Sequence, residues 1–159
     1  MMPPGAVRAG LLALALAGTA RAEVVPGEVP VDGVTAMMLF QSTCLDRLPK
    51  FSGAKTALQS ADYAENPETG TLYHPELNLS FSIKPGKQCS MVFASDEDAM
   101  VLGLMLGGAA GAENGGEIVI NSVDGDLSVD LGRGTRMIFE VIGRKAGAAY
   151  YHAAVGKGL

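Results

Sequence analysis

The chain is poor in several of the residues on which protein chemistry depends. It has 159 residues, with no tryptophan, two cysteines, two histidines and 18% charged residues. So few histidines and cysteines provide few side chains that could act as metal ligands, and we expect neither a metal nor a cofactor. Lysine and arginine form no cluster along the sequence and the formal net charge is -5, which argues against nucleic acid as a partner. The length and the 48% hydrophobic content predict one small folded domain.

The first 22 residues have the features of a secretory signal peptide. Arg8 precedes the apolar run Leu11–Gly18, and Ala20-Arg21-Ala22 is a small-x-small cleavage triplet. We therefore assign residues 1–22 to a signal peptide and residues 23–159 to a single α+β domain. The apolar run is shorter than the roughly 20 residues needed to cross a bilayer, so a periplasmic or secreted protein without a stable membrane anchor is expected. A retained anchor is the alternative.

The two cysteines, Cys44 and Cys89, both follow the cleavage site. In an oxidising compartment such a pair tends to close, and we predict a Cys44–Cys89 disulfide. It would close a loop of about 46 residues, which the chain-entropy model values at about 4 kcal/mol. Two buried free thiols are the alternative. The wide spacing excludes a CxxC redox motif.

Three helices are predicted from apolar spacing and capping residues. The first covers about 34–48 and ends before Pro49. Ser52 is expected to cap a shorter helix that reaches about residue 61. Ser95, followed by three acidic residues, is expected to start a third helix that continues to 107 or 112.

The clearest strand signal is the alternation of apolar and polar residues in 77–83 and 89–93. We predict a hairpin in which a three-residue loop, with Gly86 in the left-handed conformation, sets Phe81 opposite Cys89. This register places Cys89 on the buried face, within reach of the first helix.

A second group of strands follows the third helix. Ile118 and Ile120 precede Asp124-Gly125, and a two-residue turn there would pair Ile120 with Val129. Further strands are expected around 137–141 and 148–155. The predicted fold is therefore α+β, an antiparallel sheet of hairpins with helices packed on one face and one disulfide.

Gly103, Gly107 and Gly111 recur every four residues in the third helix. On one face of a helix such glycines allow another backbone to approach closely. The residues predict a buried helix lying tightly on the sheet, and association with another helix is the alternative.

Other constellations have structural explanations. Ser52 and Lys55 match the S-x-x-K of penicillin-recognising enzymes, but the chain lacks the accompanying K-T-G strand, so a capping serine explains them. His74, Glu76 and His152 form at most a thin set of metal ligands. The carboxylates of 124–130 lack the order of a calcium loop and are interpreted as turn and outward strand residues.

The best candidates for ligand binding lie near the C-terminus. Tyr150, Tyr151 and His152 combine aromatic and hydrogen-bonding groups, and His74 is added as a fourth candidate. Asn78, Ser80, Ser82 and Ser90 form an uncharged polar face of the first hairpin. The alternative is a solvated outer face and a final strand that packs on the core.

Short strings in the middle of the chain resemble a group of small exported bacterial proteins of unassigned function. They are Phe40-x-x-x-Cys44-Leu45, Pro49-x-Phe51 and the run from Cys89 to Ser95. The resemblance implies the crosslink and periplasmic residence, and it supplies no catalytic residue.

The leading functional hypothesis is a non-enzymatic periplasmic binding or inhibitory module, which acts on another envelope protein or on a small ligand. One alternative is a small hydrolase that uses His74 or His152. A second alternative is an envelope-associated structural protein that uses the glycine-spaced helix.

Overall fold

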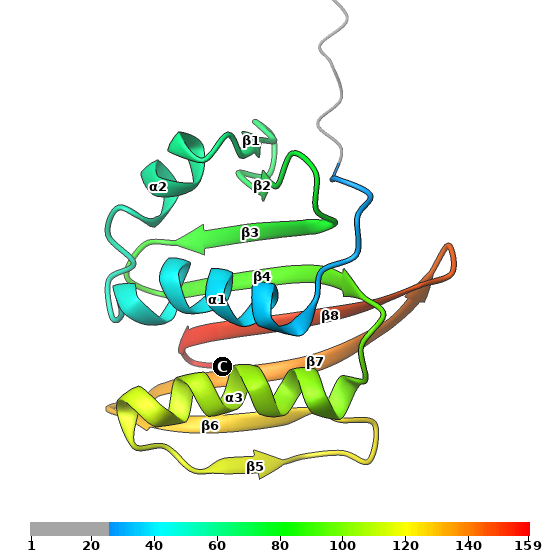
Figure 1. Cartoon of the computed structure of the whole chain (residues 1–159). Coiled ribbons are helices and arrows are strands. Elements are labelled where there is room, and N and C mark those ends of the chain that lie inside the picture. Colours follow the sequence, from blue (N-terminus) through cyan, green and yellow to red (C-terminus); the bar gives the residue numbers. More distant parts are fainter. Residues whose placement is uncertain (1–25) are drawn as a thin grey trace, which may run out of the picture.

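The computed structural model describes residues 26–159, which form one antiparallel sheet with helices on one face (Figure 1). The strand order is β1-β2-β3-β4-β8-β7-β6-β5. In chain order the elements are α1 (Gly33–Thr43), the 3-10 turn η1 (Leu45–Arg47), α2 (Ala54–Ser60), β1 (Ala64–Glu65), β2 (Leu72–Tyr73), β3 (Leu79–Lys84), β4 (Gln88–Ser95), α3 (Ala99–Asn114), β5 (Ile118–Ile120), β6 (Leu127–Gly132), β7 (Thr135–Lys145) and β8 (Ala148–Lys157). The predicted α+β class is confirmed. The predicted signal peptide lies outside the described residues.

The sheet is joined into one unit by its last strand. β8 pairs with β4 from Gln88↔Gly156 to Ser95↔Ala149, and with β7 on its other side. The β1–β4 and β5–β7 groups therefore meet only through β8. The sequence predicted a strand near 148–155, but it did not reveal that this strand would be central.

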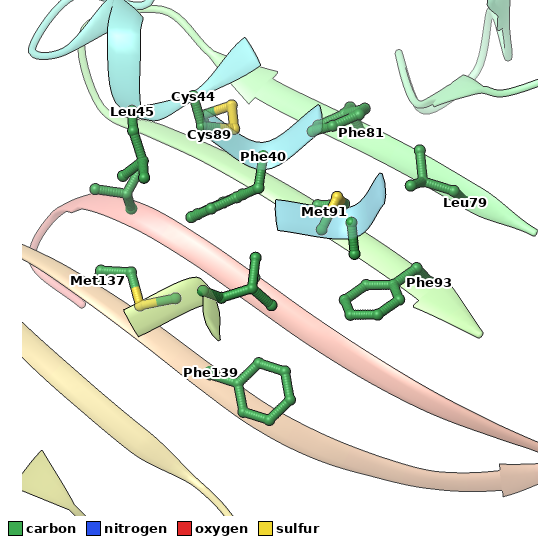
Figure 2. Close-up of a cluster of buried hydrophobic side chains, with 14 of the residues drawn as sticks. Phe40, Cys44, Leu45, Leu79, Phe81, Cys89, Met91, Phe93, Met137 and Phe139 are labelled. Atoms are coloured by element: carbon green, nitrogen blue, oxygen red, sulfur yellow. A yellow bond between two sulfur atoms is a disulfide. The ribbon is translucent and has the colours of Figure 1, made fainter. Parts of the chain in front are cut away.

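The core lies between the sheet and the helices α1 and α3, which lie side by side across one face (Figure 1). Odd-numbered residues of β3 and β4 and their counterparts on β7 and β8 point toward these helices, because successive side chains of a strand alternate between faces. Figure 2 shows this cluster, in which Phe40 of α1 meets the sheet. The largest fully buried side chains are Phe40, Phe81, Phe93, Phe139, Leu72, Leu79, Met91, Leu102, Leu106, Leu127, Met137 and Val31.

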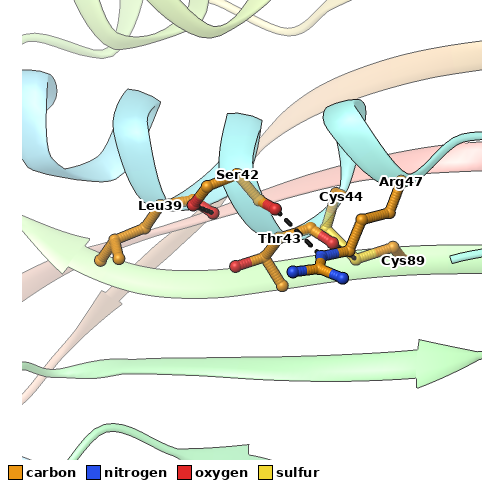
Figure 3. The surroundings of a disulfide bond; sticks show 6 residues. All are labelled: Leu39, Ser42, Thr43, Cys44, Arg47 and Cys89. Carbon is orange, nitrogen blue, oxygen red and sulfur yellow. Dashed lines mark hydrogen bonds between the residues drawn. A yellow bond between two sulfur atoms is a disulfide. The ribbon is translucent and has the colours of Figure 1, made fainter. Parts of the chain in front are cut away.

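The disulfide predicted from the sequence is present. Cys44 and Cys89 are bonded with their Cα atoms 5.5 Å apart, and both residues are fully buried. The link joins the end of α1 to the start of β4 (Figure 3). Arg47 holds the segment after Cys44, because its Nε donates to the carbonyl oxygen of Ser42 at 3.2 Å and its Nη1 donates to that of Ser52 at 3.1 Å.

The helix ends differ from the sequence prediction. α1 ends at Thr43, five residues before the expected end, and η1 continues the turn. Ser52 does not cap α2. Gly53, with a φ of 74°, occupies that position and makes no side-chain hydrogen bond, because it has no side-chain acceptor.

α3 also starts later than predicted, because Ser95 belongs to β4. The Oγ of Ser95 accepts from the backbone N–H of Glu97 at 3.2 Å, within the loop that precedes the helix. Asp98 is the N-cap instead, and its Oδ1 accepts from the backbone N–H groups of Met100 and Val101 at 2.9 and 3.2 Å. A carboxylate at this position satisfies free N–H groups and meets the positive end of the helix dipole.

The glycine-spaced face of α3 lies tightly against the sheet, as predicted. A Cβ on Gly103 would lie 2.8 Å from Leu127 and 2.9 Å from Phe139, and one on Gly107 would lie 3.1 Å from Leu127. The helix extends to Asn114, two residues beyond the later of the two predicted ends. These glycines therefore serve packing within the domain, because β6 and β7 occupy the groove that they form.

Both predicted hairpin registers are wrong by two residues. In β3–β4, Phe81 pairs with Met91 and Ile83 with Cys89. The turn explains the shift, because Pro85 and Gly86 take the two central positions of a turn in which the N–H of Lys87 donates to the carbonyl of Lys84 at 2.9 Å. Gly86 has the expected positive φ, of 70°. A shift of two residues preserves the faces, so Cys89 is still buried.

In β5–β6, Ile120 pairs with Leu127 rather than Val129, and residues 121–126 form a longer loop. Asp126 explains this difference. Its Oδ1 accepts from the backbone N–H of Val141 at 2.8 Å, so its side chain turns inward to β7 rather than outward. Val123, which the predicted turn placed in a strand, is 97% exposed.

Candidate binding groove on the open sheet face

The sheet face opposite α1 and α3 carries the polar side chains of the first hairpin. Ser80, Ser82 and Ser90 alternate with buried residues along β3 and β4, and so point away from the helices. Tyr73 pairs with Ser80, and Tyr150 pairs with Ala94, so β2 and β8 extend the same face. We call this surface the open face.

A cavity of about 340 Å³ lies on the open face. Its volume falls in the range of small-molecule sites, about 300–1,000 Å³. The lining contains hydroxyls, one amide, two tyrosine rings and no formal charge. The lining residues are Pro26, Thr71, Tyr73, Asn78, Leu79, Ser80, Ser82, Ser90, Val92 and Tyr150.

A second cavity, of about 370 Å³, adjoins the first. The two share Pro26, Val92 and Tyr150, so they form one continuous groove, which we call the open-face groove. Its second part is bounded by residues 142–145 of β7, where Arg144 and Lys145 bring positive charge. The groove is thus uncharged at one end and cationic at the other.

Tyr150 lies at the junction of the two cavities and is held in place there. Its hydroxyl accepts a hydrogen bond from Nδ2 of Asn78 at 2.9 Å. The backbone of Asn78 is itself fixed, because its N–H donates to the carbonyl of Val29 at 2.7 Å and its carbonyl accepts from Ala94 at 2.9 Å. A tyrosine held in this way offers a positioned ring face without a large loss of side-chain entropy on binding.

Tyr151 points in the opposite direction from Tyr150 and belongs to the core. Its ring stacks on Phe139, with centroids 5.7 Å apart, and lies beside Phe93 at 5.6 Å. Its hydroxyl donates to the carbonyl oxygen of Glu97 at 3.2 Å. Burial raises the pKa of the Tyr151 phenol, Asp98 raises it further, and Arg144 has the opposite effect. The structure therefore does not bring Tyr151 to the open-face groove.

His74 stabilises a loop and does not reach the groove. Its Nδ1 accepts from the backbone N–H groups of Glu76 and Leu77, at 3.1 and 2.9 Å, and its ring meets Tyr63 edge-on. Burial lowers the pKa of His74, and the Glu76 carboxylate partly opposes this effect. A ring nitrogen that accepts two N–H groups must be unprotonated, so the loop needs the neutral imidazole.

His152 lies on the open face, two residues from Tyr150. Its Nδ1 is 2.9 Å from Oε2 of Glu140, its neighbour across β7 and β8. A carboxylate at Nδ1 orients an imidazole and leaves Nε2 available. No hydroxyl or thiol within residues 26–159 forms a hydrogen bond with His152. The pair is thus an oriented base without a nucleophile in contact.

The side chains of the other candidate motifs do not come together among the residues that the structure describes. No group of three or more His, Cys, Asp or Glu side chains in the described part of the chain is arranged to hold a metal ion. Lys55 pairs with Glu65 at 2.7 Å rather than with Ser52. No helix within residues 26–159 is long and apolar enough to cross a membrane.

Sequence reasoning identified the serines, Asn78 and Tyr150, but it missed the other residues that line the groove, Tyr73 and Pro26 among them. Tyr73 lies in β2, which has two residues, and two residues are too few to show a strand period. Pro26 belongs to an extended lead-in with no apolar pattern. Both residues reach the groove only through tertiary structure.

Comparison with known proteins adds no relative. No family model matches the chain, and neither a curated protein nor a solved structure is significantly similar to it. Functional inference therefore rests on the groove itself.

Proposed function

We propose that the protein is an exported, non-enzymatic binding module that holds a neutral, hydroxyl-rich small ligand of the bacterial envelope in the open-face groove. The observation that carries this proposal is the cavity of about 340 Å³, lined by hydroxyls, an amide and two tyrosine rings. Such a lining favours a ligand that offers many hydrogen bonds and an apolar ring face, and short saccharides have this chemistry.

The site is rigid enough for this role. Its floor consists of paired strands, and its central ring, Tyr150, is bonded to Asn78. Binding to a preformed site costs little ordering entropy, so a few hydrogen bonds and one stacked ring can give useful affinity. Protection or inhibition of an envelope enzyme would follow if the bound ligand were that enzyme's substrate.

Two features support an exported location. The Cys44–Cys89 disulfide is typical of proteins that fold in an oxidising compartment. Residues 1–22 also have the sequence features that predict a secretory signal peptide. We therefore place the mature chain in the periplasm or outside the cell.

Calorimetric titration tests the proposal with two neutral probes, maltotriose and diacetylchitobiose. We expect at least one to bind, and Tyr150→Ala to abolish the binding heat. Ser82→Ala should weaken binding by about two- to tenfold, the usual effect of one hydrogen bond. Ser128→Ala, on the same face but outside the cavity lining, is the matched control. Absence of heat with both probes, or full binding by the Tyr150 variant, would contradict the proposal.

A second candidate function rests on the Glu140–His152 contact at 2.9 Å. An oriented imidazole is half of a hydrolytic site. Ser90 lies opposite Ala154 and is therefore a diagonal neighbour of His152 on the same face of the sheet. In this candidate function the hydroxyl of Ser90 would be the nucleophile that His152 activates. A panel of chromogenic esters separates the two candidates, since hydrolysis lost in His152→Ala and kept in His74→Ala would favour the hydrolase.

A third candidate function, an envelope-associated structural protein, is weakened because the glycine face of α3 is covered within the domain. Gly103 and Gly107 face β6 and β7, so association would need another surface of α3. The exposed side chains of that outer surface include Val101 and Leu104. Sedimentation of the purified protein as a monomer at high concentration would weigh against this candidate.

A further inference from the structure

The end of the molecule opposite the β7–β8 turn carries four lysines and one arginine, which come from segments far apart in the sequence. The backbone N–H of Gly86 donates to the carbonyl of Lys50, and that of Lys157 donates to the carbonyl of Lys87, both at 3.0 Å. Lys157 also pairs with Thr135, two residues after Arg133. The fold thus gathers Lys50, Lys84, Lys87, Arg133 and Lys157, which we call the basic end. No cluster is visible in the sequence, because 107 positions separate the first from the last.

The charge at the basic end is not neutralised within the domain. None of its five cations takes part in an ion pair in the described part of the chain. The carboxylates closest in sequence to these cations are Asp130, three residues before Arg133, and Asp46, four residues before Lys50. Neither forms an ion pair with a cation of the basic end within residues 26–159, and Asp130 accepts from the N–H of Gly132 at 2.8 Å. A protein with an acidic net charge therefore has one positive end.

A cavity of about 410 Å³ opens at this end. Arg133 and Lys157 contribute its cations, and Leu131, Leu48 and Pro49 contribute an apolar wall. The full lining is Leu48, Pro49, Asn114, Leu131, Gly132, Arg133, Thr135 and Lys157. A cavity with cations on one side and aliphatic carbon on the other is complementary to a ligand that has an anionic group at one end and an apolar group at the other.

We propose that this cavity binds a small amphiphilic anion, a phosphate or carboxylate joined to a short apolar group. The anionic head would lie between Arg133 and Lys157, and the apolar part would lie on Leu48 and Pro49. Two kinds of molecule combine an anionic head with an apolar part in this way, a free amphiphile in solution and an anionic lipid within a bilayer. This site is separate from the open-face groove, since the two linings have no residue in common.

The apolar wall depends on the disulfide. Leu48 and Pro49 lie four and five residues after Cys44, which is bonded to Cys89, and Arg47 fixes the same segment through two backbone carbonyls. We therefore expect reduction of the disulfide to loosen this wall and weaken binding. The open-face groove, which has no lining residue in this segment, should be less affected.

Octyl phosphate below its micellar concentration is the test ligand, followed by calorimetry and by the amide resonances of Asn114 and Thr135. Inorganic phosphate and octyl glucoside are the two half-ligands. We expect octyl phosphate to bind at least about tenfold more tightly than either, because each half-ligand loses one of the two contributions. Equal binding of octyl phosphate and either half-ligand, or no binding of octyl phosphate, would overturn the proposal.

Charge variants locate the site. Lys157→Gln and Arg133→Gln should each weaken octyl phosphate binding by about fivefold. Lys55→Gln removes the same charge on α2, where Lys55 is paired with Glu65, and should have no effect. Equal losses in all three variants would indicate unspecific attraction to positive charge and would overturn the assignment to this cavity.

Vesicles separate the two sources of the anion. Co-sedimentation with phosphatidylglycerol vesicles, lost in Lys157→Gln, would identify a lipid in the bilayer as the ligand. Octyl phosphate binding without vesicle binding would identify a free amphiphile. Both results support the site, and neither depends on whether the open-face groove binds a saccharide.

Discussion

The glycine face of α3 offers a sharp test of how the helix packs. Gly103 and Gly108 belong to the same helix but have different surroundings. A Cβ at Gly103 would lie 2.8 Å from Leu127 and 2.9 Å from Phe139, whereas a Cβ at Gly108 would have nothing within 4 Å. Substitution by alanine therefore has the same effect on helix propensity at both sites and a different effect on packing.

The magnitudes follow from these distances. At either site alanine should favour the helix by about 0.5–1 kcal/mol relative to glycine. At Gly103 the new methyl group must displace Leu127 or Phe139, both of which are almost fully buried, and overpacking of this kind costs about 1–3 kcal/mol. We expect Gly108→Ala to raise the free energy of unfolding by up to about 1 kcal/mol. Gly103→Ala should lower it by up to about 2 kcal/mol.

Urea denaturation of the oxidised protein, followed by circular dichroism, measures both values. Sedimentation of the same variants shows whether either substitution alters association. Equal stabilisation by the two substitutions would refute the tight contact between α3 and β6–β7. A change in association without a change in stability at Gly103 would restore this face as an intermolecular surface.

Three further predictions concern the crosslink and the aromatic residues. Replacing Cys44 and Cys89 by alanine should lower the free energy of unfolding by about 4 kcal/mol, as measured in urea, and a loss below about 1 kcal/mol would contradict the role of the disulfide. Burial lowers the pKa of His74 in the folded protein, so its contribution to stability is present above the unfolded pKa of 6.5 and is lost as the pH falls through the lower folded pKa. Thermal denaturation as a function of pH measures this loss. An equal loss of stability in acid for the wild type and for His74→Gln would refute the prediction. Tyr151→Ala should lower the free energy of unfolding by about 3–5 kcal/mol, whereas Tyr150→Ala should change it by less than about 1 kcal/mol. Equal losses of thermal stability in the two variants would contradict the placement of the two rings on opposite faces of the sheet.

Sequence reasoning succeeded where a pattern repeats over many residues. The alternation in β3 and β4 identified the buried face and placed Cys89 on it, whereas the disulfide itself was predicted from the cysteine pair and the expected export. The register was wrong because it was inferred from side-chain faces alone, and a shift of two residues leaves the faces unchanged. The decisive information was in the turn, where Pro85 and Gly86 require the two central positions.

The candidate sites depended more strongly on tertiary structure. Tyr150 and Tyr151 looked equivalent in the sequence, yet adjacent strand residues point to opposite faces, so only Tyr150 reaches the groove. The basic end was invisible for a different reason. Its cations come from segments that are far apart in the sequence, and backbone hydrogen bonds such as that between Lys157 and Lys87 bring these segments together.

The central place of β8 determines the order in which the molecule can assemble. A chain delivered from its N-terminus presents β4 and β7 before residues 148–157 arrive, and until then both strands have an unsatisfied edge. Both partners of the crosslink are delivered earlier, so oxidation can secure α1 on β4 while the sheet is still in two pieces. The covalent bond can thus hold α1 on β4 before the strand that joins the two halves of the sheet arrives.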